Sequence, residues 1–246
     1  GSLEANRELV EWMREYNADP SHQVKLRFYG FDSPTEMMYA DSPRQVLLFV
    51  LDYLTSIDSI SGKYHKERIE PLLGNDPEWE NPAAAMDPKL SVGLSSSATE
   101  LRIETEDLIS ELMERRPGLV AEIDESLYLE VVQYAMLARQ LLNYHGVLAR
   151  DSENRLVRLL GIRDTMMAEN LLYIVSRERY RGKMLAFANN SHLQRGKAHM
   201  QLGPHSLTWW PAGSHLNEMF GPRYVVIGSA VGLSDDNGIS QPEPGT

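Results

Sequence analysis

The stretch KMLAFANNSHLQR, residues 183–195, predicts a strand of the core that ends abruptly in polar side chains. Its first six residues are mostly apolar, as expected of a buried strand. Two amides, a hydroxyl and an imidazole follow at residues 189–192. In open α/β folds, ligands bind outside the carboxyl ends of the strands. We therefore expect this end of the strand to face a ligand, although the same residues can simply close a turn.

Two other apolar runs predict strands. VKLRFYGFD at residues 24–32 ends in a glycine and an acid, and RYVVIG at residues 223–228 is the last strand along the chain. Asp32 follows the first of these strands. Its carboxylate is expected either to lie at the same ligand-facing edge or to support a turn.

The rest of the chain is mainly helical by its apolar spacing. Helices are expected at about residues 4–17, from Ser42-Pro43 onward, from Ser97, and at 125–144, 152–179 and 212–219. Residues 97–150 then form a helical hairpin. Prolines and glycines break residues 58–96 into an irregular connection with short helical pieces, which is either a lid or a tolerated insertion.

These elements predict an α/β fold with few strands and a large helical share. A chain of 246 residues is long enough for one large domain, which we place at residues 1–232, with a flexible polar tail at 233–246. Three strands are fewer than a chain of this size usually contains. We therefore expect that further strands are missed or are supplied from elsewhere.

Composition excludes several classes of function. The net charge of -11 and the lack of a basic stripe argue against nucleic-acid binding. The chain has no cysteine, which removes disulfides, thiolate nucleophiles and cysteine-ligated metals and fits a cytoplasmic location. No apolar run is long enough for a membrane span, and no signal peptide is recognisable. The oligomeric state is left open.

The helix expected at residues 152–179 carries two polar residues within an apolar stripe. The stripe consists of Leu156, Leu160, Arg163, Met167, Asn170 and Ile174. A buried arginine must find a partner, and Asp164, Glu169 or the 189–192 cluster are the expected ones. Arg163 is either a structural ion pair between elements or a clamp for a carboxylate or oxyanion in a cleft.

His192 is the strongest acid–base residue in the sequence. Its imidazole titrates near neutral pH and suits proton transfer, but a histidine just after a strand can also be a capping or solvent-facing residue. Asn189 can donate hydrogen bonds to a substrate carbonyl or close the turn. His199, His205 and His215 lack the spacing of a known metal motif, so no metal is expected.

Taken together, four motifs resemble the erythromycin esterase family. They are ELVEWMREYN (8–17), FYGFD (28–32), RDTMMAEN (163–170) and ANNSHLQR (188–195). Their order and approximate spacing match the family, and GSHLNEMFGPRYVVIG (213–228) resembles its next helix and strand. The resemblance covers nearly the whole chain.

The resemblance implies a three-layer α/β core with a helical hairpin and a deep acidic cleft. It also implies hydrolysis of an ester or macrolactone by general-base activation of water, without metal or cofactor. His192, Arg163 and Asn189 are then expected to be catalytic, and Asn170, Asp32 and Asp164 to bind the substrate. The expected partner is a small ester or lactone such as a macrolide, with no nucleic acid and no membrane.

Two departures from the family pattern concern proton transfer. The family base lies in a G-E-x-x-H-G-like segment ahead of the region where this chain begins, and the family usually has H-N-x-H where this chain has Asn189 and His192. An amide cannot carry the proton, so we expect little or no turnover by this chain alone. The alternatives are a non-hydrolytic ligand-binding or repurposed biosynthetic protein, and a haem or metal binder that uses His192.

Overall fold

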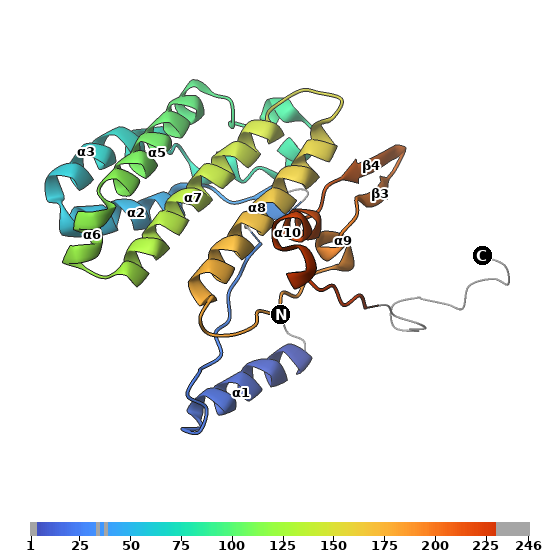
Figure 1. Cartoon of the computed structure of the whole chain (residues 1–246). Helices are drawn as coiled ribbons and strands as arrows, with labels where there is room; N and C mark the ends of the chain where they lie inside the picture. The colour runs from blue at the N-terminus through green and yellow to red at the C-terminus, as the bar shows by residue number, and fades with distance from the viewer. Residues whose placement is uncertain (1–3, 33–34, 37–38, 230–246) are drawn as a thin grey trace.

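The fold consists of a helical bundle joined by one long helix to a small C-terminal unit (Figure 1). The computed structural model describes residues 4–32, 35–36 and 39–229. The first helix, α1 (Glu4–Ala18), buries none of its residues and stands apart from the bundle in Figure 1. None of the described helices is long and apolar enough to cross a membrane.

Four helices build the bundle and its core. They are α2 (Arg44–Ile57), α3 (Ser59–Ile69), α5 (Ser96–Glu114) and α7 (Glu125–Leu148), with α6 (Arg116–Glu122) between the last two. Leu47, Leu54, Leu101, Leu108 and Val131 are fully buried in this core. The expected hairpin at residues 97–150 is therefore present as α5 and α7.

Helix α8 (Arg155–Glu178) connects the two parts of the molecule. It contacts α7 on the bundle side and both β4 (His205–Trp209) and α10 (Ala212–Phe220) on the other side. The remaining elements of the C-terminal unit are α9 (Asn190–Leu193) and β3 (Ala198–Leu202). Leu160 of α8 packs against Ala198, Leu207 and Trp209 of the two strands.

The strands β3 and β4 form an antiparallel hairpin. Leu202 pairs with His205, which leaves Gly203 and Pro204 as a two-residue turn. Gly203 has φ +56°, the value that a glycine adopts at the first turn position of a type II′ hairpin. A shorter antiparallel pair joins β1 (Thr35–Glu36) to β2 (Tyr39–Ala40).

The structure confirms the predicted α/β class with few strands and a large helical share, but it corrects where the strands lie. Residues 24–32, 183–188 and 223–228 were expected to be strands. None of them belongs to a sheet, because among the described residues their backbones have no strand partner. The hairpin at residues 198–209, by contrast, lies in a region that the sequence predicts to be loop.

The connection at residues 58–96 is more regular than predicted. Short helical pieces are present as expected, at Glu70–Leu72, Asp76–Trp79, Pro82–Ala85 and Pro88–Leu90. Residues 59–69, however, form the full helix α3, whose Ile69 is buried in the bundle core. The cap of α5 is Ser95 rather than Ser97. The predicted tail at residues 233–246 lies outside the described residues.

A buried histidine fixes the end of helix α7 to the rest of the bundle. His145 is fully buried, and its Nε2 lies 2.9 Å from the carbonyl oxygen of Asp41. Burial lowers the pKa of His145, and the hydrogen bond with Asp41 only partly offsets this effect. The folded chain therefore holds this imidazole in its neutral form.

The low pKa of His145 makes the folded state less stable in weak acid. Between pH 7 and 5.5 the unfolded chain gains a proton at residue 145 that the folded chain does not bind. The contribution of the neutral His145 to stability is therefore full above the pKa that this residue has in the unfolded chain, and it is lost as the pH falls below that pKa. We expect the unfolding free energy from urea titration to fall by about 1 kcal/mol over this range.

His145→Gln should remove this fall of the unfolding free energy between pH 7 and 5.5. His205→Gln is the control, because His205 is exposed and its loss should leave the pH dependence as it is. If the unfolding free energy changes equally with pH in the wild type and in His145→Gln, the pH dependence does not come from His145.

Candidate functional site

The centre of the candidate site is the buried carboxylate of Asp164 on α8. Its side chain is fully buried and accepts three hydrogen bonds. Oδ1 accepts from the backbone N–H of Ala212 at 2.9 Å and lies 2.9 Å from Nδ1 of His192. Oδ2 accepts from Nε1 of Trp209 at 2.6 Å. Asp164 therefore joins α8, α9, β4 and α10 at one point.

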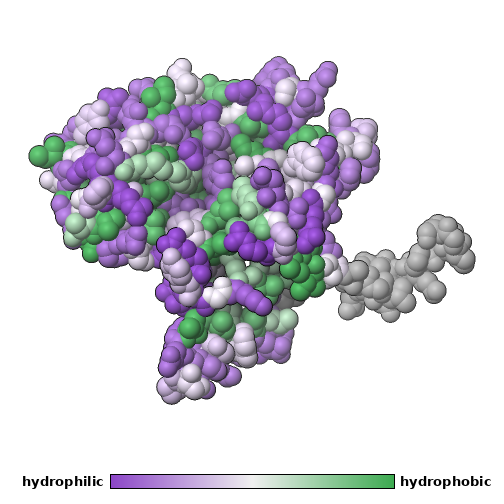
Figure 2. Space-filling model, in the orientation of Figure 1, coloured by the Kyte–Doolittle hydropathy of each residue, from purple (hydrophilic) through white to green (hydrophobic). Residues whose placement is uncertain are grey.

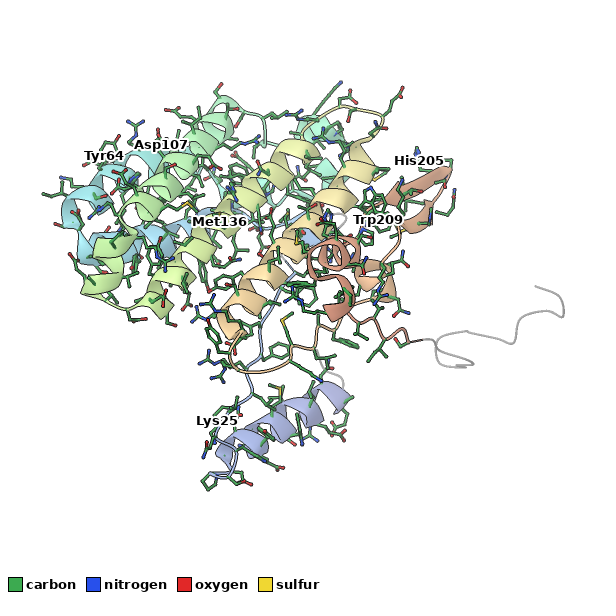
Figure 3. The ribbon with its side chains drawn as sticks, viewed as in Figure 1. Lys25, Tyr64, Asp107, Met136, His205 and Trp209 are labelled. Atoms are coloured by element: carbon green, nitrogen blue, oxygen red, sulfur yellow. The ribbon has the colours of Figure 1, made fainter. Side chains whose placement is uncertain are left out.

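The local structure explains how a carboxylate is tolerated in this position. Ala212 is the first residue of α10, so its N–H lies at the positive end of the helix dipole. Trp209 ends β4 and is itself buried, which leaves its indole N–H in need of an acceptor. In Figure 3, Trp209 lies where the hairpin meets the helices, whereas His205 lies at the far end of the hairpin. These donors offset the cost of burying the charge.

The contact with Asp164 also determines which ring nitrogen of His192 carries the proton. A carboxylate oxygen only accepts, so the neutral imidazole carries its proton on Nδ1 and donates it to Asp164. Nε2 is left with a free lone pair, and among the described residues it has no hydrogen-bond partner. The side chain keeps 18% of its surface exposed. His192 is thus an oriented imidazole that can accept a proton from a molecule in solvent.

Arg163, the residue before Asp164, makes an ion pair with Asp32. Nε donates to Oδ1 at 3.2 Å and Nη2 to Oδ2 at 2.5 Å. Two parallel bonds of this kind define a bidentate pair. Burial lowers the pKa of Arg163, but the bonds and the charge of Asp32 outweigh burial and leave this pKa above its ordinary value. The partner is therefore Asp32, and not one of the three partners that the sequence predicts.

Asn170 uses both ends of its amide within the protein. Its Nδ2 donates to the carbonyl oxygen of Phe31 at 2.9 Å, and its Oδ1 accepts from Gln133 at 2.8 Å. Together with the Arg163–Asp32 pair, this contact holds the end of residues 25–32 along α8. Asn170 thereby fixes the segment that carries Asp32.

Asn189 and Asn190 form different hydrogen bonds at the start of α9. Oδ1 of Asn189 accepts from the backbone N–H of Ser191 at 3.0 Å and from its hydroxyl at 2.8 Å, and so caps the helix. Its Nδ2 has no partner among the described residues and remains a free donor. Asn190 instead bonds the backbone of Ser229 through both ends of its amide.

The apolar segments that precede Asp32 and Asn189 end at the same place. Phe31 and Ala188 both pack against a small cluster formed by Met167 and Ala168 of α8 and Ala212 of α10. The structure therefore places Asp32 against Arg163 and His192 against Asp164, two consecutive residues of α8, and Asn189 caps the short helix that carries His192. The two segments thus end at the same cluster, but neither of them is a strand, so no sheet edge is formed there.

Two surface hollows in the described part of the chain lie away from this cluster. One is lined by Glu114, Arg115, Pro117, Gly118, Leu119 and Glu122, and the other by Arg102, Glu106, Arg139, Leu142 and Asn143. Within residues 4–32, 35–36 and 39–229, no three His, Asp or Glu side chains are grouped so that they could hold a metal ion.

Sequence reasoning missed two residues that position His192. Trp209 lies in the core, and its bond to Asp164 was not foreseen. Gly213 packs directly under α9, and a Cβ at this position would lie 2.2 Å from the carbonyl oxygen of Leu193. The signal available for the role of Trp209 was that a buried indole N–H needs an acceptor. The role of Gly213 has no sequence signal beyond the glycine itself.

Replacing the central carboxylate should destabilise the whole C-terminal unit. Asp164→Ala leaves the donors of His192, Trp209 and Ala212 without an acceptor, which we expect to cost about 3 kcal/mol or more in unfolding free energy. Asp107→Ala is the control, because Asp107 lies on the exposed face of α5 and should change stability by less than about 0.5 kcal/mol. Urea unfolding followed by tryptophan fluorescence measures both, and equal effects would contradict the role of Asp164.

A methyl group at residue 213 should push α9 away from α10. The clash of Gly213→Ala is with backbone, so it cannot be relieved by a side-chain rotation, and we expect a loss of about 1–3 kcal/mol. Gly196→Ala provides the matched control, since nothing lies within 4 Å of its Cβ position. If the two variants melt at the same temperature, the close approach at Gly213 does not exist.

Comparisons with known proteins bear on the family and the fold. The erythromycin esterase family matches residues 2–236. The crystal structure of a succinoglycan biosynthesis protein is similar with a TM-score of 0.59 and 20% identity, over 90% of this chain and 47% of that chain. A mutant of the erythromycin esterase EreC in its open conformation is similar with a TM-score of 0.58 and 19% identity, over 87% of this chain and 50% of that chain.

Identities this low show a shared fold and no more. The chain spans about half the length of the two structures that it matches. No curated protein matches the chain. The family match, which covers nearly the whole sequence, is the stronger finding, and by it the chain belongs to the erythromycin esterase family.

Proposed function

We propose that the chain serves the hydrolysis of a carboxylic ester or macrolactone, with His192 as a proton-transfer group and Asp164 as the residue that positions it. The observation that carries this proposal is the 2.9 Å contact between Nδ1 of His192 and the buried Asp164, which leaves Nε2 free. The family match and the hydrolase-like fold support the reaction class.

In the proposed reaction, a water molecule attacks the ester carbonyl while Nε2 of His192 takes one of its protons. The carbonyl π electrons move onto oxygen, and the resulting oxyanion needs hydrogen-bond donors. When the tetrahedral intermediate collapses, the C–O bond to the alcohol breaks and the imidazolium returns the proton to the leaving alkoxide. The imidazolium formed in between is stabilised by the negative charge of Asp164.

Asn189 is the proposed donor to the oxyanion. Its Nδ2 is free, and it caps α9 only three residues before His192. Arg163 is less suited to this task because Asp32 takes two of its N–H groups. We assign it, with Asn170, to holding residues 25–32 in place, while Asp32 borders the site.

The test is the hydrolysis of p-nitrophenyl acetate by the purified chain. We expect slow turnover at most, because an asparagine stands at residue 189 where the family resemblance implies a second histidine. His192→Gln should lower the enzyme-dependent rate by about 100-fold or more, the size of a lost general base. Asn189→His should raise the rate, because it adds a second imidazole three residues before His192.

His205→Gln controls for unspecific reaction with surface imidazoles, since His205 is exposed at the tip of the hairpin. A rate that falls equally in His205→Gln and His192→Gln would rule out a special role for His192. A rate that is the same in the wild type, His192→Gln and Asn189→His would overturn the proposed function.

A second candidate function is non-hydrolytic ligand binding or a biosynthetic role on the same fold. Its support is the similarity to the succinoglycan biosynthesis protein, and the use of Asn189 as a helix cap that needs no proton transfer. Under this alternative, a macrolide such as erythromycin raises the melting temperature of the chain while no hydrolysis product forms.

A further inference from the structure

The helical bundle contains a recess between α5 and α7 that is lined by arginine side chains. Its walls are Arg102 and Glu106 of α5 and Arg139, Leu142 and Asn143 of α7, and we call it the arginine recess. Its volume of about 90 Å³ has room for a few water molecules or for one small anion. In Figure 2 the surface over the bundle is largely hydrophilic, so a polar ligand suits this region better than an apolar one.

The two helices face each other in antiparallel order along the recess. Nη2 of Arg102 donates to Oδ1 of Asn143 at 2.7 Å. One helical turn further along, Nε of Arg139 lies 3.8 Å from Oε1 of Glu106. The two guanidinium groups therefore come from opposite walls and stand one turn apart. A ligand that lies between them is contacted from both helices.

Neither arginine has its hydrogen-bonding capacity filled by the protein. Within the described residues, Arg102 has no acidic partner, and Asn143 is the one acceptor for its five N–H groups. Arg139 has only the contact with Glu106, which is longer than a hydrogen bond. Both side chains are half-buried, so water reaches their N–H groups from one side only. Nδ2 of Asn143 is a further donor without a partner in the described part of the chain.

A glycine makes room for the guanidinium group of Arg102. Gly146 lies in the last turn of α7, and a Cβ at this position would lie 2.8 Å from Nη1 of Arg102. The guanidinium group therefore packs directly against the backbone of α7. Glycine makes a helix less stable than alanine does. The position of the arginine is thus obtained at a cost to the helix.

The charges of the recess favour an anion. Two guanidinium groups and one carboxylate line it, so its net charge is positive in a chain whose net charge is -11. Glu106 is not a fixed counter-ion, because its side chain is 52% exposed and its contact with Arg139 is long. The planar fork of a guanidinium group matches the oxygens of a carboxylate or a phosphoryl group. A small oxyanion therefore fits the donors that remain open.

From these observations we infer that the arginine recess is a binding site for a small oxyanion, a phosphoryl or carboxylate group that Arg102, Arg139 and Asn143 hold between α5 and α7. The inference goes beyond the proposed function and does not depend on it, because none of the recess residues takes part in the proposed proton transfer.

The test is a titration of the purified chain with inorganic phosphate and, separately, with acetate, at an ionic strength held constant with sodium chloride. NMR spectra of the arginine Nε–H groups follow the binding. The signals of Arg102 and Arg139 should shift and saturate at millimolar anion, whereas the signal of Arg158, which is exposed on α8, should not. The anion that saturates the shift at the lower concentration identifies the ligand group as phosphoryl or carboxylate.

Variants that remove a charge test the lining of the recess. Arg102→Gln and Arg139→Gln should each weaken anion binding about 10-fold or more, the size of one lost hydrogen bond to a charged group. Glu106→Gln should strengthen binding, because it removes a like charge from the wall. Arg158→Gln is the matched control, because it removes an exposed positive charge on α8 and should leave the affinity unchanged.

Gly146→Ala tests the geometry without removing a charge. Its methyl group meets the end of a flexible arginine side chain, so the fold should stay intact with an equal or higher melting temperature. The displaced guanidinium group of Arg102 should nevertheless lower the anion affinity. No saturable shift in the wild type, the same affinity in Gly146→Ala as in the wild type, or an equal loss of affinity in Arg158→Gln and Arg139→Gln would each overturn the inference.

Discussion

The hydrogen bonds accepted by one buried carboxylate determine how the C-terminal unit is arranged. Asp164 has no contact with water, so every donor that satisfies it must come from the protein. Those donors lie on three different elements, and the donor on α9 is distant in sequence from the other two. The carboxylate therefore selects one arrangement of α9, β4 and α10 on α8, where apolar packing alone would tolerate several.

The residue before Asp164 on α8, Arg163, positions the other acidic residue of the site, Asp32. Arg163 and Asp164 are neighbours in sequence, and their side chains reach different parts of the chain, Asp32 on one side and His192 on the other. Contacts that are 131 and 28 residues apart in sequence are thus formed by two consecutive residues. A rigid helix can do this because its backbone hydrogen bonds are complete, so its side chains hold fixed directions.

The helices could be predicted well because helical periodicity is a property of the chain alone. The spacing of Leu156, Leu160 and Met167 defines an apolar stripe whatever lies opposite it, and α8 occurs where this stripe predicts it. A strand, in contrast, is defined by its partner. Residues 183–188 have the composition and the alternation of a strand, yet without a neighbouring backbone among the described residues they remain an extended segment. The hairpin at 198–209 was missed for the opposite reason, since its polar residues conceal a pairing that the Gly203-Pro204 turn makes possible.

The sequence suggests the residues of the candidate site but not the pairs that they form. Residue type and position were enough to single out His192 and Arg163. Their partners depend on which segments meet across α8, and spacing along the chain does not contain that information. The assignment of roles changed most for Asp164 and Asn170, whose polar atoms are occupied by the protein itself.

Helix α8 has a mechanical consequence for the family fold. Its 24 residues make a rod of about 36 Å that contacts the bundle along one side and carries the site on the other. Asn170, bonded to Gln133 of α7, links the two. His192 and Asp32 are tied to consecutive residues of the rod, so a tilt of the rod relative to α7 would carry both side chains with it. The spacing within the site is thereby insulated from movements of the bundle.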